Sequence, residues 1–242
     1  MFDGKMKAVT FSYDDGTVQD IRLIEIFNKY GLKATFNLNS ELLGKERRIT
    51  VDGVEVCHDK IKPEDVRRVY AGHEIASHTL THPRLPGIDD DNEIIRQVEE
   101  DRLKLSELAG YEVVGFAYPC GGVNCDRRVS ELIRKNTGIK YCRTIISNYS
   151  FEKQENLYEF DPTVHHHREW DKMCALAEEF VNLSPTSPSI FYIWGHSFEF
   201  DIRDDWAQPR TRPLHKRRSR TCVQRRRHRS GRKGQDAVPF AD

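Results

Sequence analysis

The sequence has no long hydrophobic run. Residues 1–5 lead directly into the first predicted strand, and no segment offers the roughly 20 consecutive apolar residues of a membrane-spanning helix. We therefore expect neither a signal peptide nor a membrane partner. The six cysteines lack the paired spacing of a zinc ribbon or of a disulfide framework. Reduced thiols in a cytoplasmic protein are the simplest explanation, and the sequence leaves the oligomeric state open.

Net charge is also absent, because 38 basic residues balance 38 acidic ones. The balance is uneven along the chain. Residues 207–242 hold ten Arg and two Lys against two Asp, which leaves residues 1–206 with 26 basic and 36 acidic residues, a net charge of −10. The tail has few apolar side chains and no periodicity, so we expect it to be disordered or to arise from a frameshift. Binding of nucleic acid by this tail is the alternative; we expect no nucleic-acid partner for residues 1–206.

Strand-like and helix-like segments alternate along residues 1–206. Such alternation is typical of parallel βα units, and the length suits one α/β barrel. We expect Gly195 to end the last strand. The predicted strands cover residues 7–13, 34–38, 74–77, 113–118, 140–145 and 189–194, with a small hairpin within 44–63, and the predicted helices cover 20–30, 63–70, 91–109, 128–136 and 169–181.

Two acidic residues follow the first predicted strand. Asp14 and Asp15 precede Gly16, which allows a sharp turn. Neighbouring side chains of an extended chain point in opposite directions, so the two carboxylates suit different tasks: one as a metal ligand and the other as a group facing water. Taken alone, Asp-Asp-Gly is typical of a simple turn. The histidines downstream favour the functional interpretation.

His78 and His82 lie four residues apart, just after the predicted strand at 74–77. In an extended chain their rings would be about 13 Å apart, too far to share an ion. We therefore expect the chain to curl where this strand ends. One Asp with two His leaves an open coordination position, as in a catalytic zinc site.

These residues and two later motifs resemble the polysaccharide deacetylase family, which includes chitooligosaccharide and peptidoglycan deacetylases. Ser12-Tyr13-Asp14-Asp15-Gly16 is similar to the family's Thr-Phe-Asp-Asp-Gly, and His78-Thr79-Leu80-Thr81-His82 matches His-Ser/Thr-x-x-His in full. Ala117-Tyr118-Pro119-Cys120-Gly121 meets part of Arg-x-Pro-x-Gly, and Trp194-Gly195-His196 approximates Leu-x-His. Order and spacing agree from residue 7 to about 206.

The resemblance implies a catalytic domain at 1–206 with a distorted (β/α) barrel, incomplete at its C-terminal end because the tail replaces a closing helix and strand. It also implies the site residues. Asp15, His78 and His82 would bind Zn²⁺, or another divalent metal such as Co²⁺ or Ni²⁺. Asp14 would be the general base and His196 the general acid. The Cys120 N–H would stabilise the oxyanion, with Tyr118, Pro119 and Gly121 beside it.

Two departures from the family pattern bear on the site. Ala117 stands where the third motif has an arginine that holds the base, so another group must orient Asp14. The family's Asp-x-x-Asp-Trp segment, which supports the acid histidine, has no clean counterpart near residues 161–166. His165, His166 and Trp194 are further candidates: the run 165–167 is interpreted as a loop beside the site, with a second metal cluster as the alternative. Without this context His196 would be a core histidine, and no Cys/His arrangement favours Cys120 as a nucleophile.

The resulting hypothesis is a metal-dependent deacetylase of N-acetylated or O-acetylated sugars in oligo- or polysaccharides. The missing arginine motivates one alternative, a catalytically weak carbohydrate-binding protein. Another is an amidohydrolase acting on a non-sugar C–N bond, because the same constellation of groups can hydrolyse other amides.

Overall fold

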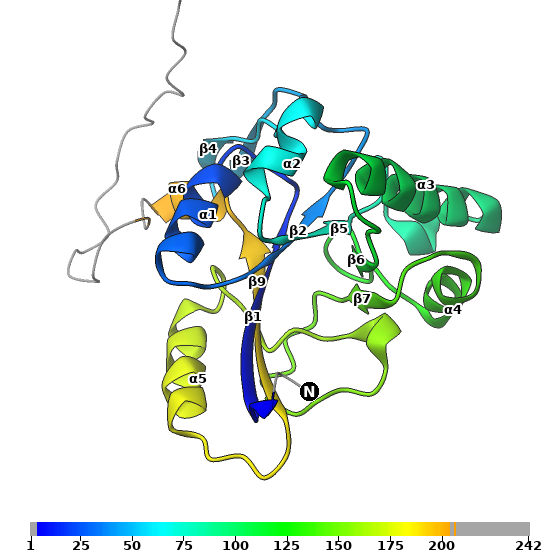
Figure 1. Cartoon of the computed structure of the whole chain (residues 1–242). Helices are drawn as coiled ribbons and strands as arrows, with labels where there is room; N and C mark the ends of the chain where they lie inside the picture. The colour runs from blue at the N-terminus through cyan, green and yellow to red at the C-terminus, as the bar shows by residue number, and fades with distance from the viewer. Residues whose placement is uncertain (1–3, 204–205, 207–242) are drawn as a thin grey trace, which may run out of the picture. The chain divides into compact units, whose positions relative to one another are not determined.

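The computed structural model describes residues 4–203 and residue 206, and the tail predicted at 207–242 lies outside these described residues. Its main feature is a seven-stranded, wholly parallel sheet in the order β7-β6-β5-β2-β1-β9-β8. The long strands β1 (Lys7–Asp14) and β9 (Ser189–His196) run side by side, with β9 next to the edge strand β8 (Figure 1).

The expected alternation of strands and helices is confirmed. The other strands of the sheet are β2 (Thr35–Leu38), β5 (Glu74–Ser77), β6 (Gly115–Ala117), β7 (Tyr141–Arg143) and β8 (Val164–His165), and the antiparallel hairpin joins β3 (Arg48–Val51) to β4 (Val54–Cys57). The α-helices are α1 (Asp20–Lys29), α2 (Val66–Val69), α3 (Asp91–Ala109), α4 (Arg127–Asn136), α5 (Trp170–Asn182) and α6 (Glu199–Arg203), with 3₁₀ turns η2 (Pro63–Asp65), η3 (Leu85–Gly87) and η4 (Leu157–Glu159).

The sheet curls into an incomplete (β/α) barrel, as predicted. Among the described residues β7 and β8 are its edge strands. A single parallel bridge joins Arg143 of β7 to Phe160, and the chain then crosses to pair Val164 with Ile193 of β9. This segment connects the two edge strands.

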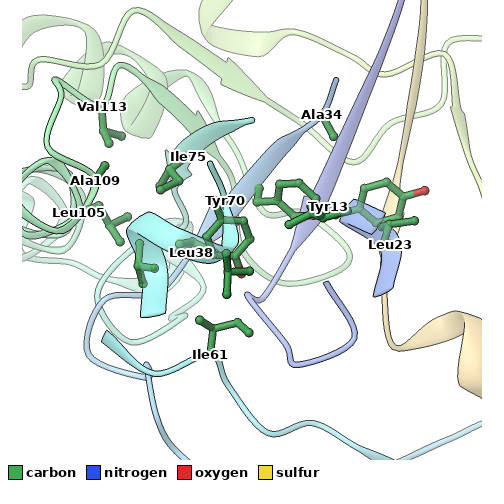
Figure 2. Packing of buried hydrophobic residues seen from close by; sticks show 14 of the residues in the cluster. Tyr13, Leu23, Ala34, Leu38, Ile61, Tyr70, Ile75, Leu105, Ala109 and Val113 are labelled. Carbon is green, nitrogen blue, oxygen red and sulfur yellow. The ribbon is translucent and has the colours of Figure 1, made fainter. Parts of the chain in front are cut away.

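Three apolar clusters lie between the sheet and its helices. The largest fills the space between β1, β2 and β5 on one side and α1, α2 and the end of α3 on the other; Tyr13, Leu38, Ile61 and Tyr70 belong to it (Figure 2). A second joins β6 and β7 to α3 and α4, and a third joins β8 and β9 to α5. Each fully buried large apolar side chain contributes about 1.5–3 kcal/mol, so these clusters fix the strands whose ends carry the polar groups.

Two local predictions are wrong. Gly195 does not end the last strand, because β9 continues through it to His196. Glycine is needed there for space: a Cβ on Gly195 would lie 2.1 Å from Cδ2 of His166. His165 lies in the short strand β8 rather than in a loop, and two residues are too few to give a periodic signal. No helix in the described part of the chain is long and apolar enough to cross a membrane.

Candidate active site

The predicted catalytic pair meets at the C-terminal ends of β1 and β9. In the parallel register Asp14 lies opposite His196 on one side and opposite Asn37 of β2 on the other. The carboxyl ends of neighbouring parallel strands share one edge, so residues far apart in the sequence converge here. As expected, Asp14 and Asp15 contact different groups.

Asp14 is buried and held by an arginine. The Arg143 guanidinium donates to Oδ1 of Asp14, and Asn37 Nδ2 donates to the same oxygen at 2.7 Å. Arg143 also lies over the Trp194 ring, 4.5 Å from its centroid. Arg143 is the register partner of Ala117 on the neighbouring strand, so the group that orients Asp14 is an arginine from β7, level with the third-motif position.

These contacts set the charge of Asp14. Burial acts to raise the pKa of its carboxyl, but the Arg143 guanidinium and the His78 and His196 rings outweigh burial and lower it below its usual value. Asp14 is therefore ionised at neutral pH. Its Oδ2 lies 3.9 Å from Nε2 of His78 and remains available to accept a proton.

Asp15 begins the turn after β1 with a left-handed backbone (φ 81°), which is uncommon for a residue other than glycine. Its Oδ1 lies 3.7 Å from Nε2 of His82, whereas its Oδ2 lies 3.0 Å from Nε2 of His58. Burial acts to raise the pKa of Asp15, but Lys60 and His58 hold it well below its usual value. The carboxylate thus keeps its charge in a buried position.

The chain curls after β5, as predicted, and brings two histidines together. Thr79 and His82 both have left-handed backbones, with φ of 70° and 62°. The rings of His78 and His82 approach with centroids 4.8 Å apart. Buried Asp101 fixes the start of this curl by accepting from the Ser77 hydroxyl at 2.6 Å and from the His78 N–H at 3.2 Å.

The donor atoms of this group fit a divalent metal. His78 Nδ1 lies 2.8 Å from the Ala117 carbonyl, which can only accept, so Nδ1 carries the proton and Nε2 keeps its lone pair. Burial lowers the pKa of His78 to about 4, so the ring is neutral as a ligand must be. One ligand atom each from Asp15, His78 and His82 lies within 4.8 Å of the others. Tetrahedral zinc with bonds of about 2.0–2.1 Å separates its ligands by roughly 3.4 Å, close to the 3.7 Å between Asp15 and His82.

The third predicted motif forms a tight loop beside this group. Cys120 has a left-handed backbone (φ 69°), and its Sγ lies 3.7 Å from Nδ1 of His82. Burial raises the pKa of the thiol, which disfavours a thiolate nucleophile. The Tyr118 hydroxyl is engaged with the Tyr158 carbonyl at 2.8 Å, and Pro119 is buried.

Glu199, at the start of α6, supports His196. Its Oε1 lies 3.4 Å from Nδ1 of His196, and its Oε2 accepts the His196 backbone N–H at 2.9 Å. Burial acts to lower the pKa of His196, but the charges of Glu199, Asp15 and Asp14 raise it to about 9. The ring is therefore protonated at neutral pH, and Nε2 is free to act as a proton donor.

His165, His196 and Glu199 also lie within 4.8 Å of one another, the geometry of a second metal cluster. The hydrogen bonds of His165 oppose metal binding. Its Nδ1 accepts the N–H groups of His167 and Arg168 at 3.1 and 3.2 Å, so the proton of the neutral ring sits on Nε2, the atom that faces Glu199. The group is better described as a carboxylate surrounded by histidine donors, and His166 Nε2 completes it at 2.8 Å.

A cavity of about 350 Å³ is shared by Asp14, His196 and the group formed by Asp15, His78 and His82. His165 and Trp194 line it, as predicted, whereas His166 lies behind Gly195 with its ring near Tyr13 and Phe200. The lining includes these site residues: Asp14, Asp15, His78, His82, Tyr118, Cys120, Gly121, His165, Trp194 and His196.

Five residues that contact Asp14, Asp15 or His196 were not predicted: Asn37, His58, Lys60, Arg143 and Glu199. Only Glu199 had a local signal, because it follows His196 by three residues at the start of a helical turn. The others reach the site through strand register and the placement of the hairpin, which the sequence does not specify.

The sequence profile of the polysaccharide deacetylase family matches residues 3–141, more than half of the chain. The chain therefore belongs to the polysaccharide deacetylase family. A comparison with curated protein sequences gives no significant match.

Several solved structures share the fold. IcaB from Ammonifex degensii aligns with a TM-score of 0.55 and 14% identity over 69% of this chain and 71% of that one. The BpsB deacetylase domain from Bordetella bronchiseptica gives a TM-score of 0.51 and 14% identity over 63% and 69%. The family 4 carbohydrate esterase from Streptomyces lividans, in complex with acetate, gives 0.51 and 16% over 82% and 83%. At these identities the likeness establishes the fold alone.

Proposed function

We propose that this chain is a divalent-metal-dependent hydrolase that removes acetyl groups from N-acetylated, or alternatively O-acetylated, sugars of oligo- or polysaccharides. One observation carries the proposal. An ionised carboxylate, Asp14, and a protonated imidazole, His196, face the same cavity, beside the potential ligands Asp15, His78 and His82. Two titratable groups whose pKa values are driven apart are typical of an acid–base pair.

Asp15, His78 and His82 would hold the metal, and zinc suits their donor set of one carboxylate oxygen and two imidazole nitrogens. When bound, a divalent cation acidifies water and polarises a carbonyl oxygen. The Ala117 carbonyl orients His78, and the His58 and Lys60 side chains contact Asp15.

Asp14 would remove a proton from the attacking water. Arg143 and Asn37 hold Oδ1, which leaves Oδ2 on the side facing His78 to receive that proton. Because Asp14 is ionised at neutral pH, it is in the form that a general base requires.

The oxyanion that develops on the acetamide carbonyl needs a donor. The backbone N–H of Cys120, in the loop that lines the cavity, makes no hydrogen bond to other described residues and would supply one. Because this donor belongs to the main chain, the cysteine side chain is not required for it.

His196 would give its Nε2 proton to the departing amine, or to the departing alcohol of an acetyl ester. Glu199 keeps the ring charged and oriented through Nδ1. Trp194, whose ring is covered on one face by Arg143, also lines the cavity.

The missing motif arginine was the reason to consider a weakly active carbohydrate-binding protein. The contact of Arg143 with Asp14 removes that reason and supports catalysis. An amidohydrolase acting on a non-sugar substrate has no specific observation in its favour.

The test is a substrate panel for the purified chain, metal-depleted or supplied with Zn²⁺. We expect metal-dependent acetate release from acetylated chitooligosaccharides and none from simple non-sugar amides. Binding of the oligosaccharides without acetate release would contradict the proposal, and release from non-sugar amides alone would assign the chain to another substrate class.

A further inference from the structure

The segment after the hairpin is bound along the loop that carries Asp15. Residues 57–61, which we call the strap, pair antiparallel with residues 16–19. The Val18 N–H donates to the Asp59 carbonyl at 2.8 Å, and the Ile61 N–H donates to the Gly16 carbonyl at 2.9 Å. Lys60 and Thr17 form an antiparallel bridge. The strap is therefore part of the structure that positions Asp15.

Two strap side chains end on Asp15. His58 donates from Nε2 to Oδ2 at 3.0 Å, and Lys60 donates from Nζ to the backbone carbonyl at 2.6 Å, with Nζ 3.6 Å from Oδ1. Both residues are buried, with relative exposures of 7% and 8%. The His58 ring also packs edge-on against Phe198, with centroids 5.0 Å apart, so its orientation is fixed.

The two contacts divide the carboxylate between different tasks. Oδ2 is occupied by His58, which leaves Oδ1 as the oxygen directed toward His82. A ligating carboxylate is commonly held in this way by a hydrogen bond to its other oxygen. Lys60, in contrast, places a positive charge beside the oxygen that would contact the metal.

We propose that His58 and Lys60 are positioning residues that set the metal affinity of the site in opposite directions. His58 strengthens binding because it fixes Asp15 with Oδ1 presented to the ligand group. Lys60 weakens binding because its ammonium charge opposes a cation at Oδ1, while it balances the buried charge of Asp15 when no cation is there. The inference rests on the proposed function, since it requires a metal at Asp15, His78 and His82.

A strap with a purely structural role predicts something different. If residues 57–61 only stabilised the loop, loss of either the His58 or the Lys60 contact would loosen Asp15. Replacing either residue would then weaken metal binding. Opposite changes in metal affinity on replacing His58 and on replacing Lys60 would therefore distinguish the proposal from a purely structural role.

The experiment is a zinc titration of the full chain in competition with a chromophoric chelator, which reports affinity without turnover. For His58→Phe, which keeps the ring packing, we expect affinity about 10–100-fold weaker than wild type. For Lys60→Met we expect affinity at least about tenfold tighter. Lys62→Met, which removes an equal charge at an exposed neighbouring position, is the matched control and should bind like wild type.

His58→Gln keeps a side-chain donor and should bind zinc more tightly than His58→Phe. This comparison shows whether weak binding in His58→Phe results from the lost hydrogen bond rather than from misfolding. Wild-type affinity in His58→Phe, or weaker binding in Lys60→Met, would overturn the proposal. His78→Ala tests the metal centre separately. Zinc binding that persisted in this variant would count against the proposed ligands themselves, and the strap proposal would fall with them.

Discussion

Replacing Arg143 should raise the pKa of the base and destabilise the fold while leaving the metal ligands in place. The guanidinium is fully buried and its partner Asp14 is 2% exposed, so Arg143→Met leaves a buried carboxylate with only Asn37 as a side-chain donor to Oδ1. Breaking a buried ion pair by removing one partner costs about 3–5 kcal/mol. We expect the free energy of unfolding at pH 7, measured with urea, to fall by that amount.

The same change should alter the pH dependence. The folded-state pKa of Asp14 lies below its unfolded value, so the pair stabilises the fold above about pH 4 and loses this contribution as the pH falls through the folded pKa. The stability deficit of the variant should therefore shrink on acidification. Without the arginine, burial raises the pKa, and the acidic limb of kcat/KM should move up by about 1–3 pH units.

A double variant gives the sharpest control. Ala117 and Arg143 are register partners on adjacent strands, so Ala117→Arg in an Arg143→Ala background returns a guanidinium to the third-motif position. We expect this double variant to recover activity relative to Arg143→Ala. An Arg143→Met variant with wild-type stability and an unchanged acidic limb would refute the reasoning.

Three further changes test other parts of the site. Glu199→Gln removes a charge that helps to raise the pKa of His196 to about 9, so His196 should lose its proton at lower pH. The alkaline limb of the kcat/KM profile should then move to lower pH by at least about one unit, and an unchanged limb would contradict this role. Cys120→Ala should keep kcat within about threefold because the proposed donor is main chain, and a hundredfold loss of acetate release would implicate the thiol. Gly195→Ala drives a Cβ into the His166 ring and should cost about 1–3 kcal/mol in urea unfolding, whereas wild-type stability would show that the ring can move away.

The sequence was sufficient to predict most elements and to single out Asp15, His78 and His82, which the fold brings together. Long periodic segments such as α3 matched their predicted bounds, because a helix with an acidic start and a glycine stop has local signals at both ends. The pairing of His78 with His82 followed from the distance argument alone, although the curl uses left-handed residues rather than a helical turn.

The supporting residues could not be predicted for a physical reason. Arg143 reaches Asp14 because β7 lies beside β6 with Arg143 level with Ala117, and strand register is a property of the assembled sheet. His58 and Lys60 depend on how the hairpin docks. The last strand was predicted at 189–194, but its continuation through Gly195 to His196 was not, because glycine is a stop signal by propensity, whereas here it makes space for the His166 ring.

The measurement that tests the central claim most directly is acetate release from an acetylated chitooligosaccharide by wild type and Asp14→Asn, both saturated with zinc. Asn can still accept hydrogen bonds from Arg143 and Asn37 but cannot take a proton. The account predicts zinc binding in both proteins and a fall in kcat of about 10²–10⁴-fold in the variant. Equal turnover by the two proteins would contradict it.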